Sequence, residues 1–154
     1  AVLEHITDPV ASFKALARVS RPGAWGCQQV DQRDHRDSSK PWEFFLLSDK
    51  EFAQMTFEGE LHHPYFGNRI RLSEFVEAAR VNGFRVLHVT RQHEEATREG
   101  LTYAKRTYQK ISRLSRTTHR YARWPREDFD ACTSNKMPIT GLLLCMGYEG
   151  PGPL

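Results

Sequence analysis

Hydrophobic and polar residues alternate with two different periods along this chain, and the pattern predicts a mixture of helices and strands. Apolar residues at helical spacing predict helices over 9–19, 73–82 and 94–121. Short apolar runs predict strands over 25–30, 84–90 and 139–148, and residues 1–3 predict the end of a further buried strand. One or two short helices are expected within 43–55, and polar loops over 31–41 and 56–68. This order of elements predicts an α/β sheet.

The ends of the first two helices carry clear sequence signals. Asp8 can accept backbone N–H groups at the start of the first helix, and Pro9 suits its first position. Ser73 is the expected cap of the second helix, and Gly83 is the expected left-handed residue after its end.

We expect a single domain over 1–150, followed by a short tail at 151–154. The apolar side of the third helix, with Leu101, Tyr108 and Ile111, is expected to cover the sheet. A buried strand that ends at residue 3 needs neighbouring strands, so the sheet is expected to be incomplete on its N-terminal side. The chain is therefore interpreted as truncated at its N-terminus, with strands supplied by a partner polypeptide as the alternative.

Composition narrows the class of protein only modestly. Hydrophobic residues make up 39% of the chain and charged residues 27%, and no apolar run approaches the roughly 20 residues of a membrane-spanning helix. No signal peptide is visible. The 3 cysteines are far apart, which favours a reducing compartment over a disulfide framework and predicts a cytoplasmic protein. Cysteines and histidines lack the spacing of a zinc site, so no metal is expected.

Positive charge is concentrated in one stretch, although the net charge is only +3. Glu99 is the only acidic residue among the basic residues Arg98, Lys105, Arg106, Lys110, Arg113, Arg116, Arg120, Arg123 and Arg126. Such a block could meet a phosphate-bearing partner or a membrane surface, but we favour the solvated face of a long helix. A nucleic acid partner is not expected, and nucleic-acid binding through this helix is kept as an alternative function.

Four segments, in this order, carry a resemblance to a known family. They are Ala-Val-Leu-Glu-His-Ile-Thr-Asp-Pro at 1–9, Arg-Pro-Gly-Ala at 21–24, Val-Asp-Gln-Arg-Asp-His at 30–35, and Asn-Arg-Ile-Arg at 68–71, the last followed by Ser-Glu-Phe at 73–75 and Asn-Gly-Phe at 82–84. Together they resemble the C-terminal portion of class I, Rossmann-like S-adenosylmethionine-dependent methyltransferases of the methyltransferase type 11 kind. The likeness covers residues 1 to about 90, and Ala24 stands where the family usually has glycine.

The resemblance implies a partial Rossmann-like methyltransferase sheet, comprising strands four to seven with their flanking helices. It implies S-adenosyl-L-methionine as cofactor and methyl transfer to a small, sugar-like or anionic acceptor. The family's glycine-rich cofactor loop has no counterpart in this chain, so the fragment is expected to be inactive alone. A non-catalytic binding module or partner-dependent subunit is the other alternative.

Candidate site residues follow from the rule that ligands of open α/β sheets bind beyond the carboxyl ends of the strands. The resemblance and this rule place Leu3, Glu4 and His5 beside the cofactor. His35 is the candidate general base, with Asp31 or Asp34 orienting it.

Four further residues are candidates for substrate binding: Arg33, Asn68, Arg69 and Arg71. Arginine can clamp a carboxylate or phosphate through paired hydrogen bonds. The structural alternatives are that His5 satisfies a backbone carbonyl, that His35 is a solvated loop residue, and that Arg69 and Arg71 hold the loop to nearby acids.

Overall fold

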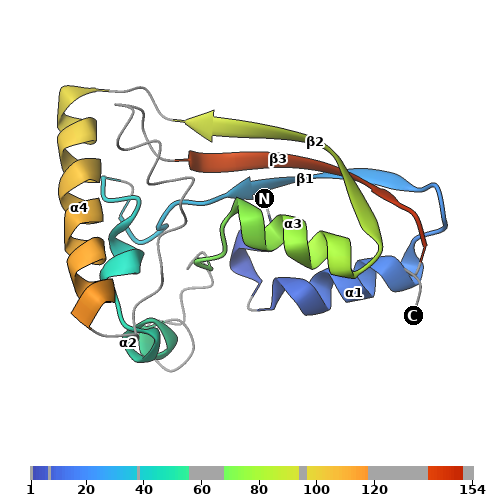
Figure 1. The fold of residues 1–154 in the computed structure, drawn as a ribbon, viewed down its shortest axis with the longest axis horizontal. Coiled ribbons are helices and arrows are strands. Elements are labelled where there is room, and N and C mark those ends of the chain that lie inside the picture. Colours follow the sequence, from blue (N-terminus) through green and yellow to red (C-terminus); the bar gives the residue numbers. More distant parts are fainter. Residues whose placement is uncertain are drawn as a thin grey trace.

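Among the residues that the structure describes, the sheet has three strands, and the last of them in sequence lies in the middle. The computed structural model describes residues 2–6, 8–37, 39–55, 68–93, 97–117 and 139–150. Strands β1 (Trp25–Asp31), β2 (Phe84–His93) and β3 (Ile139–Tyr148) are ordered β1-β3-β2 (Figure 1). Because β3 is antiparallel to both neighbours, β1 and β2 run parallel to each other.

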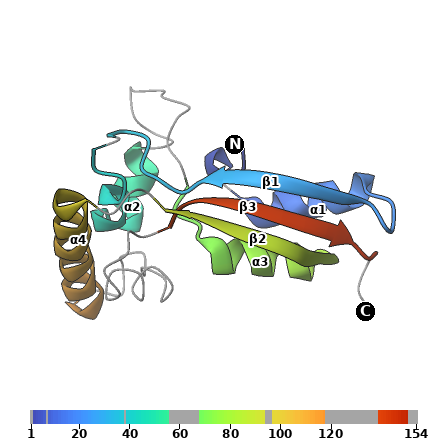
Figure 2. The same cartoon turned by 90° about the horizontal axis from the view of Figure 1, so that it is seen from above.

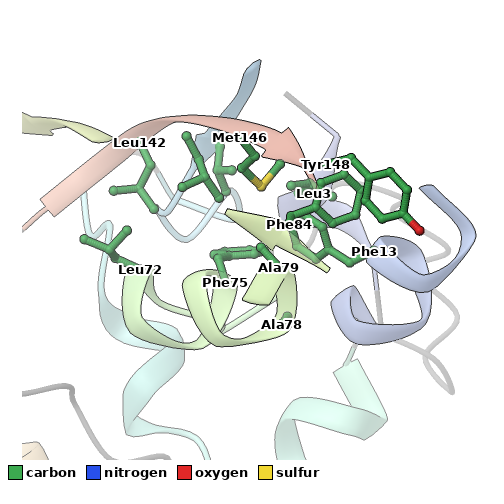
Figure 3. Close-up of a cluster of buried hydrophobic side chains, with 12 residues drawn as sticks. Leu3, Phe13, Leu72, Phe75, Ala78, Ala79, Phe84, Leu142, Met146 and Tyr148 are labelled. Atoms are coloured by element: carbon green, nitrogen blue, oxygen red, sulfur yellow. The ribbon is translucent and has the colours of Figure 1, made fainter. Parts of the chain in front are cut away.

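Two helices cover one face of this sheet, as Figure 1 shows. Helix α1 (Pro9–Val19) begins as expected: the Asp8 carboxylate accepts a hydrogen bond from the Ala11 N–H at 2.9 Å, and Pro9 occupies the first turn. Helix α3 (Leu72–Val81) packs beside it, and the core lies between the two helices and the sheet (Figure 3). Side chains that are fully buried there include Phe13, Phe75, Ala79, Leu142 and Leu144.

The long helix α4 (Arg98–Thr117) lies off the sheet, so the expectation that it covers the sheet is wrong. It packs on the short helix η2 (Glu43–Leu46), in a second apolar cluster that contains Trp42, Phe44, Phe45, Ala104 and Ile111. Figures 1 and 2 both place α4 beyond the carboxyl ends of β1 and β2. The aromatic residues before and within η2 give the apolar side of α4 a separate surface to cover.

The predicted strand at residues 1–3 is also corrected, because Val2 is not extended in a ladder and Leu3 begins the 3-10 helix η1 (Leu3–His5). Local bonds satisfy its backbone: the His5 and Ile6 N–H groups donate to the carbonyls of Val2 and Leu3 at 3.0 and 3.3 Å. So short a segment gains more from such local bonds than from a two-residue strand ladder. Leu3 itself is buried in the sheet core.

The start of α3 differs by a few residues from the prediction. Its cap is Arg71 instead of Ser73, and the Glu74 side chain accepts a hydrogen bond from the Arg71 N–H at 3.0 Å. Gly83 takes the expected left-handed conformation after the helix, with φ of +82°. The short helices expected within 43–55 are present as η2 and α2 (Asp49–Ala53). The mixed α/β class is confirmed.

Cys27 and Cys145 form a disulfide, so the expectation of unpaired cysteines is wrong. They are 118 residues apart in sequence but lie directly opposite each other where β1 pairs with β3. No helix in the described part of the chain is long and apolar enough to cross a membrane. The predicted loop at 56–67, the basic residues Arg120, Arg123 and Arg126, and the tail at 151–154 lie outside the described residues.

Candidate functional site

Two histidines from distant parts of the sequence meet at the carboxyl end of β1. His5 belongs to η1 and His35 to the turn that follows β1. Their ring centres are 5.0 Å apart, with the rings at 70° in an edge-to-face arrangement. The predicted cofactor-side and catalytic residues are therefore adjacent in space.

Asp31 is the acidic partner of His35, and Asp34 is not. The His35 Nε2 atom lies 3.6 Å from Asp31 Oδ2, a separation that becomes an ion pair when the imidazole is protonated. Asp34 instead binds Arg36, whose Nε donates to Asp34 Oδ1 at 2.8 Å. The two acids considered for orienting His35 are thus separated by the structure.

Arg33 keeps Asp31 ionised through a two-pronged contact. Its Nε donates to Asp31 Oδ1 at 3.0 Å, and its Nη2 to Asp31 Oδ2 at 2.7 Å. Partial burial would raise the pKa of Asp31, but the hydrogen bonds and charge of Arg33, helped by His35, outweigh it and lower the pKa below its usual value. Asp31 is therefore a fixed negative charge beside the His35 ring.

Glu4 is a buried carboxylate without a hydrogen-bond donor in the described part of the chain. The residue is 1% exposed, and neither Oε1 nor Oε2 has a hydrogen-bond partner there. The Nε2 atom of His5 lies 3.8 Å from Oε1. A buried carboxylate costs free energy unless donors or a cation face it. Glu4 is thus suited to accept hydrogen bonds from a ligand.

Asn68 ties the predicted substrate segment to η1. Its side-chain amide donates to the carbonyls of Leu3 and Ile6 at 2.6 and 2.9 Å, and its backbone N–H donates to the carbonyl of Glu4. These three contacts hold the backbone that carries Glu4 and His5.

Arg71 and Arg69 bind the protein's own backbone. Arg71 is 1% exposed and donates from Nη1 to the carbonyl of Gln32 at 2.9 Å. Arg69 donates to the carbonyl of Leu47 at 2.9 Å and pairs with Asp49 beside α2. Arg71 is therefore joined to the segment after β1, whereas the contacts of Arg69 are with the region of α2.

Gln32 is a site residue that sequence reasoning missed. It is 2% exposed; its Nε2 donates to the carbonyl of Ile70 at 3.1 Å, while its Oε1 has no partner among the described residues. Gln32 stands between two charged residues, so the local sequence gives no sign that it is buried. It contacts the segment at 68–71, which is distant in sequence.

Within the described ranges, no group of three or more His, Cys, Asp or Glu side chains is arranged to hold a metal ion. Comparison with protein-family models, curated proteins and solved structures finds no match for this chain.

Proposed function

We propose that this chain is the C-terminal part of a class I S-adenosylmethionine-dependent methyltransferase that acts on a small, sugar-like or anionic acceptor. The observation that carries the proposal is the meeting of His5 and His35, with Glu4 and Asp31, at the carboxyl end of β1. Ligands of open α/β sheets bind at that end.

The strand arrangement supports the same proposal. β1 and β2 are parallel and are joined by a connection that contains α3, as in a strand-helix-strand crossover unit. β3 then runs antiparallel between them. The assignment of these strands as the fifth, sixth and seventh of the family that the sequence resembles is part of the proposal.

The residues of the site fit the proposed cofactor. S-adenosylmethionine carries a sulfonium, an ammonium and hydroxyl groups, and it supplies an activated methyl group when bound. Glu4 offers two carboxylate oxygens without donors in the described part of the chain, which match such positive and hydrogen-donating groups. His5 lies near both Glu4, on the proposed cofactor side, and His35, on the proposed acceptor side.

His35 is proposed to accept the proton that the acceptor's hydroxyl or amine must lose on methylation. The bound cofactor would supply the methyl group and would leave as S-adenosylhomocysteine. Asp31 stabilises the resulting imidazolium, and Arg33 keeps Asp31 charged for that role. Asn68 and Arg71 position the two segments that carry these groups, since both donate to backbone carbonyls beside the site. Arg33, whose side chain is 41% exposed, remains the candidate contact for an anionic acceptor.

The proposal is tested first on the gene. The reading frame upstream of Ala1 should encode a strand followed by a Gly-x-Gly-x-Gly loop. The full-length protein should bind S-adenosylmethionine in a calorimetric titration. A full-length protein that does not bind the cofactor overturns the proposal.

The second test separates the roles of the site residues in the full-length protein. We expect His35→Asn to slow methyl transfer by about 100-fold to 10,000-fold and to leave cofactor affinity unchanged. Glu4→Gln should weaken cofactor binding. His88→Asn is the matched control, because His88 is exposed on β2, and it should change neither quantity. Equal methyl transfer by His35→Asn and the wild type would exclude His35 as the base.

A further inference from the structure

Helix α4 has two chemically different sides. Its apolar side is buried: Ala104 and Ile111 pack against Trp42, Phe44 and Phe45. Its other side carries exposed cations, which we call the basic face: Arg98, Lys105, Arg106, Lys110 and Arg113. Glu99 is the only acidic residue in the helix.

A groove runs along the edge of the basic face. Its volume is about 470 Å³, and it lies between α4 and the segment at 39–43. Lys40 joins Arg106 and Lys110 in its lining, together with the hydroxyl-bearing residues Ser39 and Thr107. The carboxylates of Glu43 and Glu99 also line it, so cations outnumber anions there.

Two of these cations form no ion pair in the described part of the chain, where no carboxylate pairs with Arg106 or Lys110. Lys40, by comparison, lies 3.5 Å from Asp37. Because Glu99 is the only acidic residue of α4, the five exposed cations of the basic face give the helix a net positive charge toward whatever approaches it.

We propose that the basic face and its groove bind the phosphate backbone of a single-stranded nucleic acid. The face runs from Arg98 to Arg113, roughly 22 Å at the rise of an α-helix, which is longer than a single phosphate group requires. A positive groove that follows the backbone, lined by an aromatic residue, is typical of single-strand binding. Tyr103 lines this groove, and its ring stacks on Trp42 with centres 5.8 Å apart.

A membrane surface is the less favoured partner. Helices that lie on membranes insert an apolar side between the lipids. The apolar side of α4 is occupied by η2 and its neighbours. The exposed side chains of α4, among those that the structure describes, are all charged or polar. The five cations of the basic face are exposed. This agrees with the solvated face expected from the sequence and leaves these side chains accessible to a partner.

The test measures binding of a fluorescent oligouridine by anisotropy, between about 50 mM and 200 mM salt. Arg106→Gln combined with Lys110→Gln should weaken binding and reduce the slope of log affinity against log salt by about 1.4, at roughly 0.7 per lost phosphate contact. The matched control combines Lys14→Gln with Arg18→Gln, which removes the same charge at the same spacing from the exposed side of α1. The control should bind like the wild type, and circular dichroism should show that both variants are folded.

Three results would overturn the inference. One is the absence of salt-dependent binding by the wild type, and another is an equal loss in both double variants, which would indicate net charge alone. The third is that the wild type binds phosphatidylserine vesicles and not the oligouridine, and that the Arg106 and Lys110 changes abolish vesicle binding. This result would identify a membrane surface as the partner. Because the basic face is separate from His5 and His35, none of these results bears on the proposed methyl transfer.

Discussion

At the scale of single residues, Arg71 was predicted to bind substrate, but its contacts are with the protein itself. Its guanidinium donates to the Gln32 carbonyl and lies 5.5 Å from the centre of the Phe45 ring. These contacts link the start of α3 to the segment after β1 and to the aromatic cluster under α4. A buried arginine in such a place stabilises three parts of the molecule at once.

We therefore expect Arg71→Met to lower the free energy of unfolding by about 1–3 kcal/mol, because it keeps the bulk but leaves the buried Gln32 carbonyl without its donor. Arg80→Met is the control on the same helix: Arg80 is exposed and, among the described residues, its ion-pair partner is the exposed Glu77, so its loss should leave stability unchanged. Urea unfolding of the two variants measures the difference. Equal midpoints for both variants would show that Arg71 does not hold these segments together.

At the scale of elements, two glycines in the left-handed conformation lead into strands, and the two glycines have different surroundings. Gly83 leads from α3 into β2 with φ of +82°, and Gly23 precedes β1 with φ of +84°. A Cβ atom at Gly83 would lie 2.2 Å from the Gly150 carbonyl oxygen, whereas one at Gly23 would meet nothing within 4 Å. The backbone conformation is the same, so the pair separates conformational strain from a steric clash.

Gly23→Ala should cost only the left-handed strain, about 1–2 kcal/mol of unfolding free energy. Gly83→Ala should cost clearly more, because the backbone at Gly150 must move and the Glu149 N–H bond to the Gly83 carbonyl, at 2.9 Å, is disturbed. Thermal or chemical unfolding of both variants gives the comparison. A smaller loss for Gly83→Ala than for Gly23→Ala would contradict the close approach of Gly150.

At the scale of the whole molecule, the disulfide between Cys27 and Cys145 joins an early strand to the last one. The chain has 3 cysteines, so the denatured protein should have one reactive thiol before reduction and three afterwards. Reduction should also lower stability by about 2–5 kcal/mol, because the link closes a long loop. Titration with a thiol reagent in denaturant measures the count.

Three thiols without reductant would mean that the cysteines are unpaired, as the cytoplasmic prediction requires. One thiol would favour an oxidising compartment, since disulfides are rare where thiols are kept reduced. The count therefore tests the compartment predicted from the sequence without bearing on the reaction.

The sequence by itself determined the elements whose signals are local. Asp8 and Pro9 mark the start of α1, Gly83 marks the end of α3, and the apolar run of β3 is visible without knowledge of its neighbours. Such features depend on backbone bonds and side-chain periods within a few residues. The predicted site was also partly local, because Asp31, Arg33 and His35 belong to one turn and interact across it.

Only the tertiary structure decided what those elements meet. Whether β3 lies at an edge or between β1 and β2 depends on long-range pairing, and the disulfide depends on that placement in turn. The segment at η1 and the position of α4 were mispredicted for the same reason: each depends on which distant surface is available to pair or pack. Arg69 and Arg71 were predicted to bind a substrate because arginine suits an anionic ligand. In the folded chain they instead donate to the carbonyls of Leu47 and Gln32, which local sequence patterns cannot predict.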